Sequence, residues 1–273
     1  MTTVYGNPSS LHSVGQRAKE ALDAARETVA QCLGCEPREI IFTSGGSEAD
    51  NQAIISAARL GEKKGKKHII STAFEHHAVL HTLKKLEKEG FEIELLDVHQ
   101  GHNITAQQVK DAIRPDTCLV TTMYANNEIG SILPIAEIGA ICKEAGVPFH
   151  TDAVQAAGKI PLDLADVPVD MLSISGHKLH APKGIGLLFV RKGVLFRPFM
   201  RGGHQEKGRR AGTENVPYIV GLGVACQLAK DSMHDELTRV AALRDRLEKG
   251  IVSQIPDTLV NGDTENRVPN TTN

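Results

Sequence analysis

What the 273-residue sequence lacks excludes several classes of protein. No apolar run approaches the roughly 18–20 residues that a membrane-spanning helix needs. Its 31 lysines and arginines nearly balance 33 aspartates and glutamates, so neither nucleic acid nor a membrane surface is expected as a partner. Residues 1–10 contain no basic stretch followed by an apolar one, the pattern of a secretory signal. We therefore expect a soluble, cytoplasmic protein.

Cysteine is also scarce. The five cysteines are odd in number and scattered, which is not the pattern of a disulfide framework. Cys32 and Cys35 form a CxxC motif, the pattern of a redox pair or of half a zinc site. However, no second such motif follows, and this one closes a helical pattern at Gly34 rather than opening one. We interpret both as ordinary cysteines near a helix end, and we predict no metal site.

Helical and strand patterns alternate along most of the chain. Short apolar runs predict strands at 40–42, 68–70, 91–98, 118–123, 147–150, 171–174 and 185–190. Helical spacing is found at 13–33, with Ser13 as the N-cap, near 47–64, 77–89, 105–113 and 135–145, and from about 214 to 250. Strands separated by helices predict an α/β fold, with a mainly parallel sheet and helices on both faces.

Ligands of such sheets bind beyond the carboxyl ends of the strands, so we examined the residues that follow each strand. Small residues, Thr43 to Ser47, follow the first strand and lead into a helix. The free N–H groups at a helix N-terminus suit a phosphate. A side-chain cap at Ser44 or Ser47 explains the same residues equally well.

Polar side chains follow the later strands too. His76 could be a metal ligand, a proton shuttle, a ring stacked on an aromatic ligand or a structural residue. Asp152 either caps the next helix or needs a cationic partner. Lys178 lies where a desolvated, nucleophilic amine would be useful. With Asn127 and Gln155, these residues form the set that an aldehyde cofactor with a phosphate, a phenolic oxygen and a pyridine nitrogen requires.

Seven segments in order resemble the cysteine desulfurases of the NifS and IscS type, which are pyridoxal-phosphate enzymes of the class V aminotransferase group. They are GNPSSLH (6–12), FTSGGSEADN (42–51), EHHAVL (75–80), ANNEIG (125–130), HTDAVQAAGK (150–159), SGHKLHAPKGIG (175–186) and GRRAGTENV (208–216). The resemblance implies an aminotransferase-like, fold type I large domain of three layers. It assigns 1–12 to an N-terminal segment, 13–225 to the cofactor-binding domain, and 226–273 to linking helices and the start of a smaller, incomplete C-terminal domain.

The resemblance also implies roles for single residues. Lys178 resembles the lysine that binds pyridoxal phosphate and later moves the substrate Cα proton, and His76 resembles the histidine stacked on the cofactor ring. These two are the predicted catalytic residues. Asp152 would pair with the ring nitrogen, Gln155 would contact the phenolic oxygen, and Asn127 would lie near that oxygen and the substrate carboxylate.

The phosphate would be held by Gly46, Ser47, Ser175 and His177, and by Thr213 of a neighbouring subunit, which implies a homodimer. The implied activity removes sulfur from L-cysteine, leaving alanine and an enzyme persulfide. That sulfur would pass to an acceptor such as an iron–sulfur scaffold protein. A selenocysteine lyase has similar motifs, and a cofactor-binding fragment without activity is a second alternative.

The sequence departs from the family pattern at both ends. The segment that precedes GNPSS in the family is short here, and the family's nucleophilic cysteine, in a Ser/Gly-rich loop, has no counterpart. The substrate-carboxylate arginine that lies later in the family is missing as well. We therefore expect a chain truncated at both ends that is inactive by itself.

Overall fold

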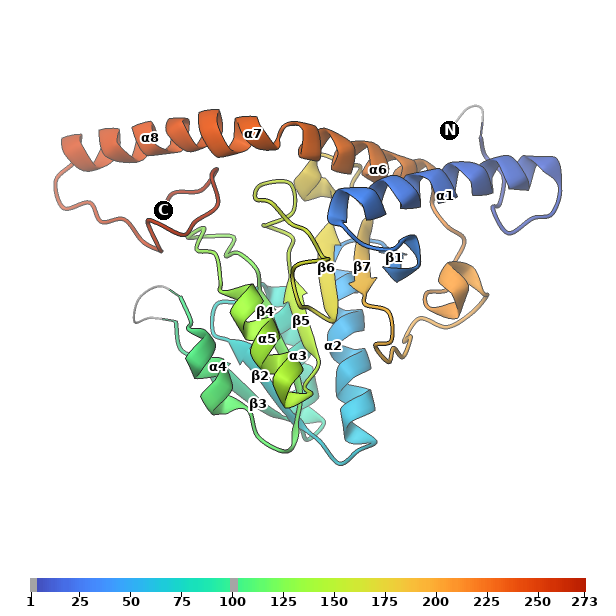
Figure 1. Cartoon of the computed structure of the whole chain (residues 1–273), viewed down its shortest axis with the longest axis horizontal. Coiled ribbons are helices and arrows are strands. Elements are labelled where there is room, and N and C mark those ends of the chain that lie inside the picture. Colours follow the sequence, from blue (N-terminus) through green and yellow to red (C-terminus); the bar gives the residue numbers. More distant parts are fainter. Residues whose placement is uncertain (1–3, 99–102) are drawn as a thin grey trace.

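A seven-stranded sheet forms the centre of the computed structural model, which describes residues 4–98 and 103–273 (Figure 1). Its strands are β1 (Ile40–Thr43), β2 (His68–Thr72), β3 (Glu92–Leu96), β4 (Thr117–Met123), β5 (Phe149–Asp152), β6 (Met171–Ser175) and β7 (Gly186–Val190). They lie in the order β1-β7-β6-β5-β4-β2-β3, and β7 is antiparallel to both of its neighbours while the other pairs are parallel. The predicted α/β fold with a mainly parallel sheet is confirmed.

Helices cover both faces of this sheet, as predicted. One face carries α1 (Ser13–Leu33), α4 (Ala106–Ala112), α5 (Ile135–Ala145) and α6 (Val216–Asp231), and the other carries α2 (Gly46–Glu62) and α3 (His77–Lys88). Successive side chains of a strand point to opposite faces. Ile70 of β2 therefore belongs to the first of two buried apolar clusters, whereas its neighbour Ile69 belongs to the second.

The starts of two helices differ from the sequence predictions. Ser13 is the first residue of α1 rather than its cap, because the side chain of His12 accepts the hydrogen bond from the Gly15 N–H. Gly45 is the cap of α2 and provides no side-chain bond, so neither Ser44 nor Ser47 caps this helix. The first-turn N–H groups of α2 are thus left without a side-chain partner from the cap.

The helical pattern after 214 extends slightly further than predicted. Past α6 the chain continues through α7 (Met233–Asp235), a π-helical turn η4 (Glu236–Val240) and α8 (Ala241–Gln254), which together form a long arm beside the sheet (Figure 1). The tail then returns to the loop after β4, where the Val268 N–H donates to the Gly130 carbonyl. Within the described residues, no helix combines the length and apolarity that crossing a membrane requires.

One buried carboxylate connects three distant segments. Glu206, in the short helix η3 (Gln205–Gly208), accepts hydrogen bonds from both terminal nitrogens of Arg26, at 3.0 and 2.6 Å. Its Oε2 also accepts from the Phe42 N–H at 3.1 Å. The φ angle of Glu206 is 46°, a conformation that non-glycine residues rarely adopt. Its contacts with α1 and β1 therefore outweigh an unfavourable local geometry.

The Arg26–Glu206 pair predicts a large loss of stability on substitution. Glu206→Gln removes the negative charge and leaves the guanidinium of Arg26 half-buried without its counter-ion, so unfolding should become easier by about 3 kcal/mol. Urea denaturation measures this change. Asp235→Asn is the matched control, because Asp235 pairs with Arg239 on the exposed surface of the arm and should matter little. Equal urea midpoints for the two variants would contradict the assignment.

Candidate active site

A cavity of about 390 Å³ lies where the carboxyl ends of β4, β5 and β6 face the N-terminus of α2. Its volume is within the range of roughly 300–1,000 Å³ typical of small-molecule sites. Nine of the ten predicted site residues line it: Gly46, Ser47, His76, Asn127, Asp152, Gln155, Ser175, His177 and Lys178. Thr213, the tenth, is exposed and is not among the lining residues.

One end of the cavity suits an anion. The helix α2 begins there with free N–H groups and the positive end of its dipole. A Cβ atom at Gly46 would lie only 2.9 Å from Val154 Cγ2 and 3.2 Å from Ser175 Cβ, so the backbone approach at this turn requires glycine. The Ser175 hydroxyl lies 2.9 Å from His177 Nδ1, which places both side chains at the same end.

The two arginines near Thr213 bind groups of their own chain and are not free to bind an anion. Arg210 forms two hydrogen bonds with the carboxylate of Glu48, at 2.8 and 3.1 Å. Arg209 donates to the Ile40 carbonyl at 3.2 Å. Both guanidinium groups therefore fix the loop to β1 and α2 of the same chain, and Thr213 remains exposed beside them.

The other end of the cavity suits a cation. Asp152 is 5 % exposed, and its Oδ1 accepts one hydrogen bond from the Val154 N–H at 2.9 Å. Burial raises the pKa of this carboxyl group to about 6, an effect that the Val154 hydrogen bond opposes. In the described part of the chain, no lysine or arginine forms an ion pair with it. An ionised Asp152 would therefore be stabilised by a cationic ligand.

Two further buried acids, which the sequence analysis missed, lie beside Asp152. Asp50 of α2 also lines the cavity, and its Oδ1 has no hydrogen-bond partner. Glu75 accepts from the Thr72 hydroxyl and from the Met123 N–H, whereas its Oε2 has no partner. The sequence did contain one indication that Asp50 is buried: its helical spacing places it on the same side of α2 as alanines and an isoleucine.

Lys178 and His76 are the exposed, reactive groups of the site. Lys178 follows β6 in the short helix η2 (Gly176–Leu179). Partial burial of the His76 ring, followed by the charges of His77 and Lys178, lowers the pKa of His76. His76 Nδ1 also accepts the hydrogen bond from the Ala78 N–H that caps α3, which requires that nitrogen to be unprotonated. The ring therefore presents a neutral face to the cavity.

The two asparagines after β4 have different environments. Asn126 is buried, and its amide bonds to the Phe74 carbonyl and to the N–H groups of Glu128 and Ile129. Asn127 is exposed and lines the cavity. The first asparagine thus shapes the loop, and the second is available to a ligand.

Gln155 completes the polar lining. Its Oε1 accepts a hydrogen bond from the Lys159 amine, which leaves the amide NH₂ group to donate. Together, the lining offers an anion site, a buried carboxylate with no cation of its own, an amine and a neutral imidazole. The α2 N-terminus at Gly46 fits the phosphate of pyridoxal phosphate, and the buried carboxylate of Asp152 fits its pyridine nitrogen.

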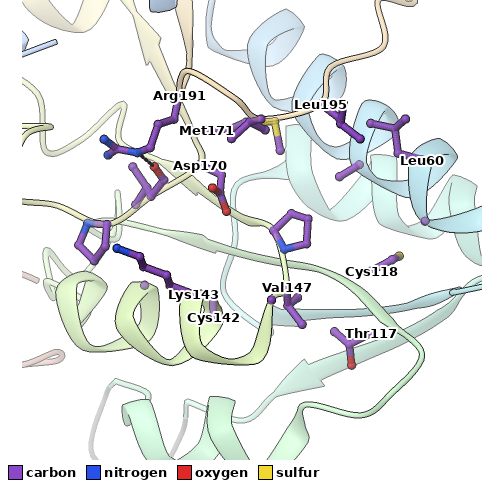
Figure 2. Close-up of a pocket in the computed structure, with 18 of the residues that line it drawn as sticks. Leu60, Thr117, Cys118, Cys142, Lys143, Val147, Asp170, Met171, Arg191 and Leu195 are labelled. Atoms are coloured by element: carbon purple, nitrogen blue, oxygen red, sulfur yellow. Dashed lines mark hydrogen bonds between the residues drawn. The ribbon is translucent and has the colours of Figure 1, made fainter. Parts of the chain in front are cut away.

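A larger cavity, of about 630 Å³, lies near the opposite ends of the strands (Figure 2). Two of its polar groups are already engaged: Arg191 donates to three backbone carbonyls, and Asp170 accepts from the Phe149 N–H. Burial raises the pKa of the lining thiols Cys118 and Cys142 to about 12, so both remain protonated. Despite its size, this cavity contains none of the predicted site residues.

The remaining cysteines are equally unreactive. Burial raises the pKa of Cys35 and of Cys226 to about 12, and it raises the pKa of Cys32 as well. The thiolate is the nucleophilic form of cysteine. All five thiols are free, and none of them lines the 390 Å³ cavity.

Comparisons with known proteins agree with the site. The family described as "Aminotransferase class-V" matches residues 1–273. "Cysteine desulfurase 2" of Trichormus variabilis is 52% identical over 273 residues, which are 100% of this chain and 68% of that protein. A solved structure titled "NIFS-LIKE PROTEIN" superposes with a TM-score of 0.94 at 39% identity, covering 98% of this chain and 73% of the other.

A second solved structure, titled "SspA in complex with cysteine", gives a TM-score of 0.78 at 45% identity, covering 82% of this chain and 65% of the other. The family match and the match to the Trichormus protein both cover all 273 residues, and therefore every segment that lines the cavity. The chain therefore belongs to the class-V aminotransferase family and, within it, to the cysteine desulfurases of the NifS and IscS type.

Proposed function

We propose that this chain provides the cofactor-binding part of an L-cysteine desulfurase. The observation that carries the proposal is the convergence of Lys178, His76 and Asp152 on one cavity whose far end is the N-terminus of α2. The relatives named cysteine desulfurase and the SspA structure with cysteine support L-cysteine as the substrate. Pyridoxal phosphate, the cofactor of this family, supplies an electron sink for the bond cleavage.

Each lining residue has a task that its surroundings permit. The first-turn N–H groups of α2, with Ser47, Ser175 and His177, bind the phosphate. Asp152 holds a proton on the ring nitrogen by opposite charge. The neutral ring of His76 stacks on the cofactor.

The remaining side chains orient the substrate and move its proton. The free NH₂ group of Gln155 donates to the phenolic oxygen, and Asn127 lies near that oxygen and the substrate carboxylate. Lys178, exposed in the cavity, would hold the aldehyde carbon of the cofactor through its amine. The same amine would also move the proton of the substrate Cα.

The sulfur nucleophile lies outside the five cysteines of this chain. All five have a pKa raised by burial, and none lines the cavity. The full reaction would pass the substrate sulfur to a cysteine on another segment, as a persulfide, and then to an acceptor such as an iron–sulfur scaffold protein. The free thiols of the chain are compatible with the reducing cytoplasm.

We further propose a two-fold homodimer with composite sites. Thr213 is exposed and outside the cavity lining of its own chain, so it is available to the phosphate of a partner. The apolar side chains of Tyr5 and Leu11, in the segment before α1, are 88% and 93% exposed and are likewise available to a partner. The domain limits 13–225 and 226–273 remain a proposal, with the division inside α6.

The first prediction from the proposed function concerns the residue to which the cofactor is covalently attached. Incubation with pyridoxal phosphate followed by borohydride reduction should place the label on Lys178, and Lys178→Ala should lose it. Lys183→Ala, which removes an exposed amine of the same loop, should retain the label. Peptide mapping makes the measurement. A label on Lys183 or Lys192 in the wild-type protein would disprove the role of Lys178.

The second prediction concerns sulfur release. A polypeptide of these 273 residues, supplied with pyridoxal phosphate, L-cysteine and a thiol reductant, should release no sulfide above the rate of free cofactor, because its thiols are protonated and distant from the cavity. Sulfide is measured colorimetrically. The proposal fails if the wild-type polypeptide releases sulfide and a variant with one of the five cysteines replaced by alanine does not.

The third prediction concerns the dimer. Light scattering should give twice the 29.4 kDa of one chain. In a composite site, mixing Lys178→Ala with Thr213→Ala chains creates hybrids with one fully intact site, which binds cofactor with wild-type affinity. If Thr213 acted within its own chain, no hybrid site would be intact. The control mixture contains Thr238→Ala in place of Thr213→Ala, because Thr238 is an exposed threonine of the arm.

A further inference from the structure

A buried polar network surrounds Asp50 beneath the cavity. Asp50 and Asp152 each place a carboxylate oxygen, and His76 a ring nitrogen, so that all three atoms lie within 4.8 Å of one another. On the other side, Asp50 Oδ1 lies 3.7 Å from His150 Nε2. Both nitrogens of His150 face hydroxyl groups, Thr121 at 2.8 Å and Ser173 at 2.9 Å.

Two carboxylates at this separation cannot both be ionised at low energetic cost. Each is at most 5 % exposed, and like charges in a buried site repel strongly. The counter-charge does not come from His150, because burial lowers the pKa of its ring to about 3 and leaves it neutral. The pair therefore retains one proton near neutral pH.

The surroundings decide which carboxyl group holds that proton. Asp152 Oδ1 accepts a backbone hydrogen bond from Val154, which stabilises its ionised form. Asp50 Oδ1 has no hydrogen-bond partner, and the Ser173 side chain offsets only part of the effect of burial on this carboxyl group. In agreement, burial and the nearby charge of Asp152 raise the pKa of Asp50 well above its usual range, whereas that of Asp152 rises only to about 6.

We propose that Asp50 is a positioning residue of the cofactor site: it holds the single proton of the Asp50–Asp152 pair, and as a neutral, polar neighbour it leaves Asp152 ionised toward a bound ring nitrogen. This inference rests on the proposed function, because the ring nitrogen belongs to the proposed cofactor. Sequence reasoning and the comparisons assign Asp50 no role.

The other titratable groups around the pair do not replace Asp50. Burial raises the pKa of Glu75 to about 8, so Glu75 is largely protonated at pH 7 and adds little charge. His76 is neutral, as described above. Lys178 is the cation of the cavity, and it forms no ion pair with either aspartate in the described residues.

Carbon-13 NMR of the protein labelled at the aspartate carboxyl carbon tests the proposal without cofactor. The resonance missing in Asp152→Asn should titrate near pH 6, and the one missing in Asp50→Asn should titrate at a higher pH, after Asp152 has ionised. Asp50→Asn, which preserves a neutral polar group, should leave the Asp152 titration within about 0.3 pH units of wild type. Asp50→Leu should raise it by about one unit, because an apolar neighbour disfavours the ionised form.

Cofactor affinity at pH 7 provides the second measurement. Asp50→Leu should weaken pyridoxal-phosphate binding about twofold, because a rise of about one unit brings the pKa of Asp152 to the pH of the measurement and roughly halves its ionised fraction. Asp50→Asn should keep the wild-type affinity. Ser56→Ala is the control, because it removes a buried hydroxyl of α2 that accepts a hydrogen bond from the Arg197 N–H. It should change neither the Asp152 titration nor the cofactor affinity.

Three results would overturn the inference: Asp50 ionised at pH 7 in the wild-type protein, Asp152 titrating after Asp50, or an unchanged Asp152 titration in a folded Asp50→Leu. The wild-type spectrum decides the first two even where the leucine variant fails to fold. Loss of the proposed function would be seen separately, as a borohydride label away from Lys178 with the carboxyl titrations unaltered.

Discussion

A carboxyl group buried at the end of β5, with no cationic side chain paired to it, is the constraint on which the site depends. Asp152 is placed there because β5 is a central strand that ends beneath the cavity, flanked by β4 and β6. Burial alone would keep this group protonated well above the usual aspartate range. A ligand that brings a positive charge to this position stabilises the ionised form, so the fold itself specifies the charge of what binds beside Asp152.

The opposite end of the cavity imposes the complementary requirement. The N-terminus of α2 offers N–H groups and a positive dipole end, and glycine at 46 allows the backbone to approach Ser175 closely. A ligand with an anionic group at one end and a basic nitrogen at the other can therefore lie in only one direction. That direction presents its middle to Lys178, the one reactive amine among the lining residues of this cavity. Orientation thus follows from two opposed electrostatic ends.

Chemistry rather than volume distinguishes this cavity from the larger one of Figure 2. In the larger cavity, Arg191 and Asp170 form hydrogen bonds with backbone groups, and the two lining thiols are protonated. In the smaller one, Asp50 retains a buried oxygen without a partner, and so does Glu75 close to Asp152. Folded proteins rarely leave such atoms unpaired, so their presence marks a place where the fold bears an energetic penalty for function. The same penalty underlies the role inferred for Asp50.

The sequence by itself determined the strands, most helices and nine of the residues that line the cavity, because hydrophobic periodicity, strand-end position and short motifs are local properties. Only the tertiary structure decided the rest. Asp50 looks like one polar residue within a helix until α2 packs on β5 and brings it to Asp152. Likewise, Arg210 looks free to bind an anion until the fold brings it to Glu48. Such pairings join residues far apart in the chain, and no periodic pattern encodes which partner a buried charge will meet.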